Sequence, residues 1–321
     1  MRAETRSVSI IIPARNEAAH LPALLSSLAG LDYPKAQFEI IVVDHESTDA
    51  TPTLARNGGA SVIPHRGGTI SGVRNRGAHA AKGEVLAFLD ADCTVDPQWL
   101  KNAVRHFDDP QVGAVGSYHV VPMDPPTWVR RILQKQIESR PQLSEPNWLP
   151  SGNMFVRREA FVKCGGFDES MATCEDVDLS YRLAQESRLV ADARIRCWHH
   201  GEPRTLWEVF RKELWRGRDN LLGAIRHGVT LSELPSLVLP VYFTLALMGL
   251  LATPLVATAR TGLAWWWLAG TASALLVPLF MVAGLFSFRS GTFRYFFQFA
   301  AYFLTYFLAR GIGPAYAWRN I

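Results

Sequence analysis

Asp90 and Asp92 stand two residues apart, directly after the apolar run 85–89. That run has the length and composition of a buried strand. Carboxylates at the C-terminal edge of such a strand can hold a hard divalent cation, and through it a diphosphate. Because Asp-x-Asp is also common in turns, the pair alone is weak evidence, and the other polar residues along the chain must support a metal site.

Polar residues also follow two earlier strand-like runs. Arg15, Asn16 and Glu17 come after the run 7–12, and Asp44 comes after the run 38–43. Helix-like stretches at 21–28 and 51–57 alternate with these runs and with a third at 61–64. This alternation predicts an α/β fold with a mainly parallel sheet and helices on both faces. In such sheets ligands bind beyond the carboxyl ends of the strands, so the polar residues should meet in one crevice.

The segment 122–150 is rich in proline and arginine and predicts an irregular linker or lid around a short helix. Ser151, Gly152 and Asn153 follow it. A helix is expected at 158–164, a turn at Gly165-Gly166, and a strand at 194–198 that leads to His199.

The chain changes character near residue 230. Of its 321 residues, most of the charged ones lie before that point, whereas 234–259 and 261–288 contain none. Each of these two runs exceeds the roughly 20 residues that an apolar helix needs to cross a bilayer. The run 295–309 is only marginally long and fits an oblique or re-entrant helix. We therefore expect a catalytic domain at 1–230 and a membrane domain at 231–321 with two or three helices.

The charge distribution predicts the orientation in the membrane. The apolar run 8–12 is too short for a signal sequence, and six Arg and Lys residues between 204 and 226 precede the first span. The catalytic domain should therefore face the cytoplasm at the inner (plasma) membrane. The net charge of +4 is modest and no basic block resembles a nucleic-acid arm, so no nucleic-acid partner is expected.

The four cysteines show no paired spacing. They are Cys93, Cys164, Cys174 and Cys197. This pattern argues against a zinc site and fits reduced thiols of the cytosol. We interpret them as small packing residues.

Several of these signatures occur in a fixed order. They are IIPARNE at 11–17, VVDHESTD at 42–49, RNRG at 74–77 with AKGE at 81–84, FLDAD at 88–92, and GGFDE at 165–169 leading to EDVDL at 175–179. The set resembles family 2 glycosyltransferases of the GT-A fold over about residues 6–220. The resemblance implies a nucleoside diphosphate sugar donor, Mg²⁺ or Mn²⁺ as cofactor, and single displacement with inversion at the anomeric carbon.

The resemblance assigns the nucleoside pocket to four residues. Asp44 is implied as a contact to the base, where its carboxylate accepts from a base N–H. Pro13, Asn16 and Glu17 are implied as the rest of the pocket. The family often has a second acid after Asp44, but this chain has His45, which leaves both UDP- and GDP-linked sugars open.

The diphosphate and metal positions also follow from the resemblance. Arg74 and Asn75 fall where the family approaches the diphosphate, and a guanidinium suits phosphate recognition. Asp92 is implied as the main metal ligand, with Asp90 shared between the ribose and the metal. His199 is a third possible metal ligand, and a structural histidine is the alternative. The small segment of Ser151, Gly152 and Asn153 is implied beneath the donor sugar.

Inversion requires a base on the acceptor side. Asp176 matches the position of the family's base, with Glu175 beside it and Asp178 in reserve. If these residues open a helix, its dipole favours the ionised carboxylate. The plainer alternative is that they are N-terminal helix charges alone.

One departure from the family indicates transfer of a single sugar. Processive synthases carry Gln-x-x-Arg-Trp on the last cytoplasmic helix, whereas this chain has KELWRG at 212–217. The apolar helices that accompany the catalytic domain favour a lipid-linked or membrane-proximal acceptor, with polyprenyl phosphate and a polyprenyl-diphosphate-linked oligosaccharide both open. A nucleotidyltransferase and a non-catalytic membrane scaffold are the alternatives of other classes. A nucleotidyltransferase would have a glycine-rich loop after the run 7–12, which this chain lacks. The intact set of acids speaks against a scaffold that has lost activity; the set is Asp44, Asp90, Asp92, Glu175 and Asp176.

Overall fold

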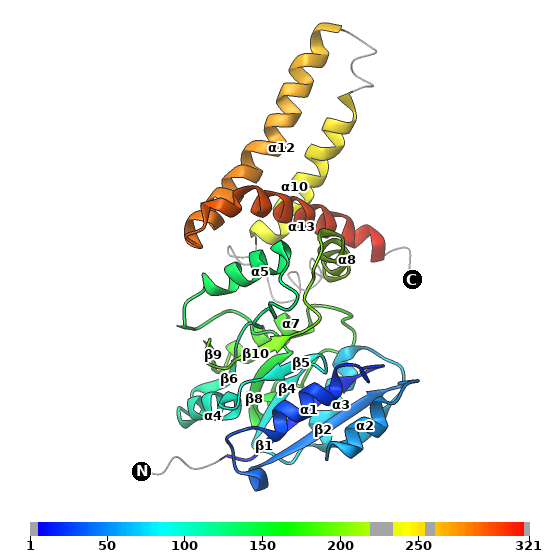
Figure 1. Cartoon of the computed structure of the whole chain (residues 1–321), viewed down its shortest axis with the longest axis vertical. Helices are drawn as coiled ribbons and strands as arrows, with labels where there is room; N and C mark the ends of the chain where they lie inside the picture. The colour runs from blue at the N-terminus through cyan, green and yellow to red at the C-terminus, as the bar shows by residue number, and fades with distance from the viewer. Residues whose placement is uncertain (1–5, 219–233, 254–260, 318–321) are drawn as a thin grey trace. The chain divides into compact units, whose positions relative to one another are not determined.

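The computed structural model describes residues 6–218, 234–253 and 261–317. Its contacts divide the chain into two compact units (Figure 1). The first unit consists of Met1–Pro122 and Arg140–Glu202, and the second of Met123–Ser139 and Pro203–Ile321. The expected domain boundary at 230/231 lies outside the described residues, as does Arg226 of the expected basic segment.

The first unit is built on an eight-stranded sheet in the order β3-β2-β1-β4-β8-β6-β9-β7. The described strands are β1 (Val8–Ala14), β2 (Phe38–His45), β3 (Ser61–His65), β4 (Val85–Leu89), β5 (Cys93–Val95), β6 (Val112–Gly116), β7 (Leu143–Ser144), β8 (Asn153–Arg157), β9 (Arg188–Asp192) and β10 (Cys197–His199). The half from β3 to β4 is parallel, while β8 pairs antiparallel with both β4 and β6. This arrangement confirms the expected α/β class with a largely parallel sheet.

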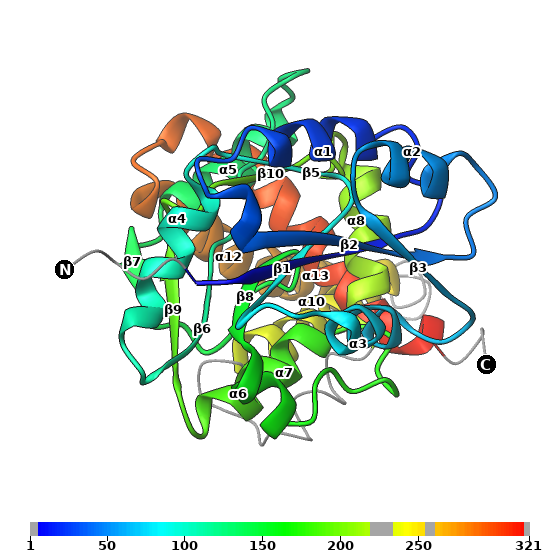
Figure 2. The same ribbon diagram turned by 90° about the horizontal axis from the view of Figure 1, so that it is seen from below.

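Alternation along β1 explains why the sheet is covered on both faces. Ile10 and Ile12 join one buried cluster, whereas Ile11 joins the other. Both faces are apolar, as a parallel strand buried on two sides requires. Figure 2 shows the result, with α1 (Leu21–Ala29) and α2 (Thr51–Asn57) on one face and α3 (Ile70–Ala80), α6 (Arg158–Lys163) and α7 (Glu175–Ala184) on the other.

The expected helices at 21–28, 51–57 and 158–164 are confirmed by α1, α2 and α6. The first unit also contains α4 (Trp99–Val104) and the short 3₁₀ turns η1 (Lys35–Gln37) and η2 (Arg105–Asp108). A close approach at Gly77 fixes α3 on the sheet, because a Cβ there would lie 2.4 Å from Cγ2 of Ile11. This contact brings Arg74, one turn earlier on α3, to the carboxyl edge of the sheet.

The strand expected at 194–198 is shorter and later than the sequence indicated. Asp192 ends β9 and accepts hydrogen bonds from the backbone N–H and the guanidinium of Arg194. This local turn competes with extended structure, as Asp side chains commonly do. The chain then re-enters a strand only at β10, which pairs antiparallel with β5.

The second unit is helical. Its described helices are α5 (Trp128–Glu138), α8 (Leu206–Arg216), α10 (Leu234–Leu251), α12 (Thr261–Arg289), η3 (Phe293–Tyr295) and α13 (Phe296–Ala317). The short helix expected within 122–150 is confirmed by α5, and the structure groups α5 and α8 with the apolar C-terminal helices. Thr127 and Thr205 cap α5 and α8 by accepting the N–H groups of Arg130 and Glu208.

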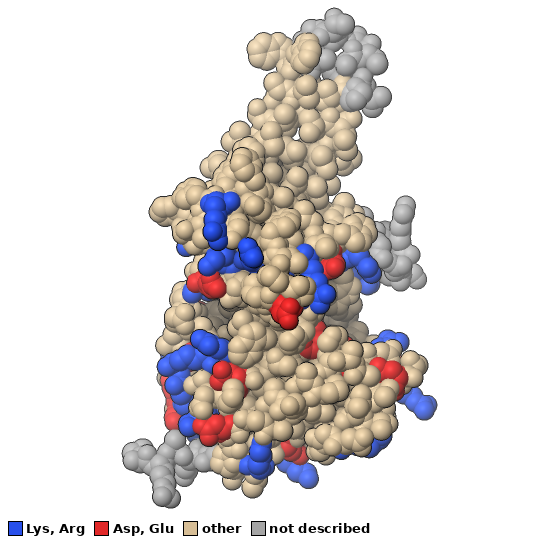
Figure 3. Space-filling view, viewed as in Figure 1, with Lys and Arg blue, Asp and Glu red and all other residues tan. Residues whose placement is uncertain are grey.

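Two helices of the described chain are long and apolar enough to cross a membrane, namely Leu234–Leu251 and Trp265–Arg289. Only 11% and 17% of these segments are buried. A core helix of a soluble protein would be mostly buried, so these helices present apolar side chains to their surroundings. In Figure 3 the upper part of this helical pair shows no coloured charge on the face in view, whereas Lys, Arg, Asp and Glu appear below it.

The third apolar segment differs from these two. α13 packs against α8, α10 and α12, and it crosses the base of the α10 and α12 pair in Figure 1. Within it, Arg310 donates to Glu213 of α8 at 2.8 Å, and only 6% of the Glu213 side chain is exposed. A buried ion pair of this kind ties α13 to an amphipathic helix of the same unit.

Candidate active site

The loops that follow β1, β2 and β4 enclose a cavity of about 300 Å³ at the carboxyl edge of the sheet. The sequence predicted that polar residues would converge at this edge. The residues that line the cavity are Pro13, Ala14, Arg15, Glu17, His45, Ile70, Val73, Asp90, Ala91, Asp92 and His199. Metal-site and nucleoside-pocket residues of the sequence analysis therefore share one cavity.

The loop after β1 is held to the loop after β2 by hydrogen bonds. Asn16 has φ +57°, and its side-chain oxygen accepts the N–H of Thr48 at 2.8 Å. Asn16 also donates its own N–H to Ser47 at 3.0 Å, and Glu17 donates its N–H to Thr51 at 2.8 Å. Asn16 therefore shapes the pocket wall, while the Pro13 and Glu17 side chains line it directly.

Asp44 lies at the end of β2, in register with Ala14 of the cavity wall. Its Oδ1 atom is buried and has no hydrogen-bond partner among the described residues. A buried acceptor without a donor is costly, and a ligand N–H would remove that cost. The position and the open acceptor fit a contact to a nucleotide base.

Asp90, Asp92 and His199 form the polar floor of the cavity. Nε2 of His199 lies 3.4 Å from Oδ1 of Asp92, because β10 and β5 pair and set His199 opposite Cys93. Burial raises the pKa of Asp92, and the charge of Asp90 raises it further. Two negative carboxylates this close repel each other, and a cation bound between them would remove that repulsion.

The ligand types at this floor suit a divalent cation, although in this structure Asp90, Asp92 and His199 do not lie as close together as Cys93, His119 and Cys197 do. Two carboxylates and an imidazole are oxygen and nitrogen ligands suited to Mg²⁺ or Mn²⁺, with room for substrate phosphate oxygens. Gly201 approaches this group so closely that a Cβ there would lie 2.3 Å from Oδ2 of Asp92. The backbone thus forms a tight cradle around the Asp92 carboxylate.

Arg74 joins two acids rather than opening into the cavity. Only 5% of its side chain is exposed, and it donates to Oδ1 of Asp90 at 2.9 Å and to Oε1 of Glu175 at 2.8 Å. Burial alone would raise the pKa of Asp90, but the charges of Arg74, His199 and His119 together outweigh burial and lower that pKa. In this structure the Arg74 guanidinium is thus bound by Asp90 and Glu175, and the contact with the diphosphate and the share of Glu175 in catalysis stay predictions.

Asp176 is the second residue of α7 and lies beside the Ser151 backbone, whose nitrogen is 3.4 Å from Oδ2 of Asp176. Burial raises the pKa of Asp176 to about 7, and the charge of Glu175 adds to the rise. A carboxylate with a pKa near the working pH is suited to act as a general base. Asp178, the reserve candidate, is instead paired with Arg182 at 2.5 Å on the same helix.

The side chains of Asn75 and Asn153 form hydrogen bonds with other parts of the first unit. The Asn75 amide donates to the carbonyl of Phe167 and to Glu169, and its oxygen accepts the N–H of Phe167. Asn153 is fully buried and bonds Trp99 through its oxygen and two backbone carbonyls through its nitrogen. Both side chains thus bind protein groups in this structure, and the ligand contacts expected of them stay a prediction.

Ser151 and Gly152 do lie at the site. The Ser151 hydroxyl is 3.4 Å from Oε1 of Glu175. A Cβ on Gly152 would lie 2.3 Å from Oδ2 of Asp90 and 2.9 Å from Nε2 of His119. Small size at position 152 is therefore required by the close approach of Asp90 and His119.

Three residues near the floor were missed by the sequence analysis. Cys93, His119 and Cys197 gather beside it, although the cysteine spacing indicated packing residues only. The His119 ring also lies 5.0 Å from the ring of His199, centroid to centroid. Its position just after β6 follows the same rule that identified Asp44 and Asp90, so the signal was present in the sequence.

Comparisons with known proteins agree with this geometry. Residues 9–165 match the sequence profile described as Glycosyl transferase family 2. The chain is 31% identical to Beta-monoglucosyldiacylglycerol synthase of Nostoc sp. over 191 residues, which cover 55% of this chain and 41% of that protein. It is 30% identical to Pre-mycofactocin glycosyltransferase of Mycobacterium tuberculosis over 236 residues, which cover 69% of this chain and 48% of that protein. The chain thus spans about half the length, or less, of these relatives.

A solved structure shares the fold. Mannosyltransferase PcManGT from Pyrobaculum calidifontis, in complex with GDP-Man and Mn²⁺, superposes with a TM-score of 0.64. The match covers 98% of this chain and 88% of that chain at 19% sequence identity. At this identity the likeness establishes the fold, a mixed α/β GT-A arrangement.

Proposed function

Because the chain belongs to glycosyltransferase family 2, we propose that it transfers one sugar from a nucleoside diphosphate sugar to an acceptor at a membrane. The observation that carries the proposal is that Asp90, Asp92 and His199 line one cavity, while Arg74 links Asp90 to Glu175, the neighbour of Asp176. A donor site and a base thus occur together, as a single displacement needs.

On the donor side, the base of the nucleotide fits against Asp44. Uracil and guanine each carry a ring N–H that the open Oδ1 of Asp44 accepts. We therefore propose a UDP- or GDP-linked sugar, consistent with the solved mannosyltransferase that holds GDP-Man.

Asp92, Asp90 and His199 would hold Mg²⁺ or Mn²⁺. When bound, the cation supplies positive charge that offsets the charge of the departing diphosphate. Arg74 keeps Asp90 ionised and fixed, and Gly201 leaves space for the Asp92 carboxylate. These residues orient the donor so that its anomeric carbon faces the acceptor.

On the acceptor side, Asp176 takes the proton of the attacking hydroxyl as that oxygen bonds to the anomeric carbon. The bond from this carbon to the diphosphate breaks on the opposite face, so the configuration inverts. Burial raises the pKa of Asp176 to about 7, so its carboxylate can accept a proton near neutral pH. Ser151 and Val177 hold the base through their N–H groups, at 3.4 and 2.9 Å.

We propose a membrane-bound acceptor because of the second unit. The exposed apolar faces of α10 and α12 would be covered by lipid, and Trp265 and Trp266 at 74% and 81% exposure suit the membrane interface. The exposed Trp207 on the amphipathic α8 suits a helix that lies in the membrane interface. The ion pair between Arg310 and Glu213 holds α13 beside this helix. The relative in Nostoc is named for synthesis of a glycolipid, which supports a lipid acceptor. We place the catalytic unit on the cytoplasmic side of the inner membrane.

The test uses the full chain in detergent with Mn²⁺. Labelled UDP- and GDP-sugars are offered with diacylglycerol, polyprenyl phosphate or a polyprenyl-diphosphate-linked oligosaccharide. We expect one sugar on one acceptor class and release of nucleoside diphosphate. Failure of every donor to be transferred or hydrolysed would contradict the proposal, and release of inorganic diphosphate would indicate a nucleotidyltransferase.

A further inference from the structure

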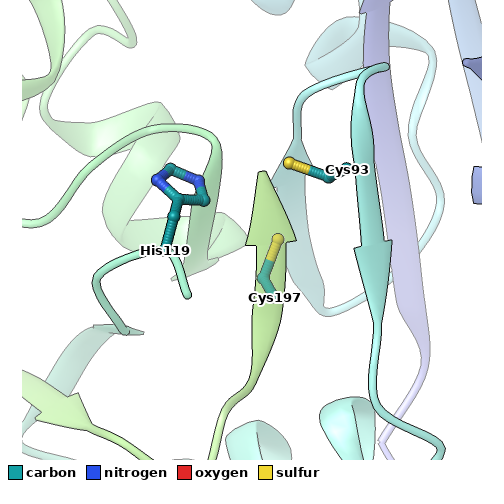
Figure 4. A group of neighbouring side chains, drawn as sticks. All are labelled: Cys93, His119 and Cys197. Atoms are coloured by element: carbon teal, nitrogen blue, oxygen red, sulfur yellow. The ribbon is translucent and has the colours of Figure 1, made fainter. Parts of the chain in front are cut away.

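Two cysteines and a histidine meet behind the active-site floor. One ligand atom each of Cys93, His119 and Cys197 lies within 4.8 Å of the others. Figure 4 shows both sulfur atoms and the imidazole directed toward a common space. In a tetrahedral zinc complex, ligand atoms lie roughly 3.5–4 Å apart, so a shift of about 1 Å closes the group on an ion.

The backbone fixes all three positions. β5 and β10 pair so that Cys197 faces Val95 and His199 faces Cys93, which sets the two cysteines diagonally across the ribbon. The His119 loop is tied to the same ribbon, because Val120 donates its N–H to the carbonyl of Cys197 at 2.7 Å and accepts from His199 at 3.2 Å. The group therefore does not depend on a flexible loop.

A second observation indicates a ligand at this place. Nε2 of His119 is buried and makes no hydrogen bond of regular geometry among the described residues, and the Cys93 thiol interacts with the same imidazole. A buried imidazole nitrogen normally has a hydrogen-bond partner. A metal ion can take the place of that partner, because neutral imidazole binds metals readily through its nitrogen lone pair. Cys93 and Cys197 are buried as well, at 1% and 0% exposure.

We propose that Cys93, His119 and Cys197 form a site for a thiophilic metal ion, with zinc as the expected occupant. Thiolates and imidazole select Zn²⁺ over the hard cations that suit Asp90 and Asp92. Two thiol protons leave as the ion binds, and a fourth coordination position stays open. The site is separate from the donor cavity in its ligands, and its existence does not rest on the proposed activity.

The site would join the two strands that carry the donor-site ligands. Cys93 follows Asp92 directly, and Cys197 lies two residues before His199. An ion bound to both cysteines fixes β5 against β10 and thereby the separation of Asp92 and His199. Its role is to position those two side chains.

The experiment uses the purified full chain, stripped of metal and titrated with Co²⁺ while excess Mg²⁺ occupies the oxygen-rich site. We expect one equivalent of Co²⁺ with a thiolate charge-transfer band and the intense visible bands of tetrahedral cobalt, displaced by Zn²⁺. Cys93→Ala and Cys197→Ala should each abolish the charge-transfer band or reduce it strongly, and His119→Ala should weaken binding. The matched control, Cys164→Ala, should leave the spectrum unchanged.

A measurement on the unmodified chain covers the case in which a variant fails to fold. Zn²⁺ should slow maleimide labelling of Cys93 and Cys197 relative to Cys164 and Cys174, as read by peptide mapping. Absence of the charge-transfer band in the unmodified chain would overturn the proposal. Full retention of that band in the Cys93→Ala, Cys197→Ala double variant, or protection of Cys164 and Cys174 alone, would overturn it equally.

Discussion

The end of β4 and the start of α7 each present two acids, and Arg74 binds one acid of each pair. It pairs with Asp90 in the first region and with Glu175 in the second. The partners left over, Asp92 and Asp176, both have a raised pKa, because each is buried beside the charge of its neighbour. One arginine therefore pairs with one acid in each region and leaves the other acid without an arginine partner among the contacts described.

The two remaining acids differ in what faces them. Asp92 lies against the His199 imidazole, whereas Asp176 accepts only the backbone N–H groups of Ser151 and Val177 among the contacts described. An acid next to a second ligand suits a cation, and an acid with a pKa of about 7 suits proton transfer. The surroundings, more than the residue type, thus decide the chemistry.

The largest effect is expected from Asp92→Asn. Removing the charge that holds the cation should lower transfer by about 10³-fold or more, since such a cation contributes several kcal/mol at the transition state. The measurement is transfer rate against Mn²⁺ concentration. Asp96→Asn, four residues further along the chain, is the control and should keep the wild-type dependence. An unchanged rate for Asp92→Asn would remove Asp92 from the metal site.

Arg74→Met should have the next largest effect. It leaves Asp90 and Glu175 without their cation in a buried place, at a cost of about 3–5 kcal/mol in the free energy of unfolding. Thermal unfolding in detergent measures it. Arg182→Met, which breaks the more exposed pair with Asp178, should cost less. Equal losses for the two variants would contradict the special part given to Arg74.

Gly152→Ala probes the contact with Asp90. The new methyl group would lie 2.3 Å from Oδ2 of Asp90, so the carboxylate has to move, and overpacking of this kind costs about 1–3 kcal/mol. We expect weaker Mn²⁺-dependent nucleotide binding by calorimetry. In Gly30→Ala the nearest atom is 3.5 Å away, so binding should be unchanged. Wild-type affinity in Gly152→Ala would show that Asp90 does not set the donor site.

Glu175→Gln should give the smallest change, a shift of the pH profile. The base reacts when ionised, so the rate rises with pH through the pKa of Asp176, near 7. Since the Glu175 charge helps to raise that pKa, its removal should move the rising limb to lower pH. Glu159→Gln, an exposed change on α6, should leave the limb in place. A limb that moves to higher pH would refute the coupling.

Much of the fold could be predicted because it rests on local patterns. Apolar runs ended by Asp44 and Asp90 identified two parallel strands and the edge at which they meet. The sequence could not show that Asn153 points inward to Trp99, because residues of one strand alternate between faces and register decides which face is the core. The strand expected at 194–198 begins only at Cys197, because hydrogen bonds from Arg194 to the Asp192 side chain form a turn first.

The sequence predicted which residues lie near the site, but not which side chains they bind. Sequence spacing gave Arg74 a place near the diphosphate, yet its guanidinium is used by two acids that lie 16 and 101 residues away along the chain. The cysteine cluster was missed because Cys93 and Cys197 come together only through the pairing of β5 with β10. Such long-range pairings leave no local signal in a single sequence.

The division between donor-holding and proton-accepting acids is tested most directly by Asp176→Asn. Calorimetry with UDP or GDP and Mn²⁺, together with transfer at saturating donor, is measured on this variant and on the unmodified chain. We predict nearly unchanged nucleotide affinity and a loss of about 10²–10⁴-fold in transfer, the usual contribution of a general base. Lost nucleotide affinity with wild-type transfer at saturating donor would contradict the account.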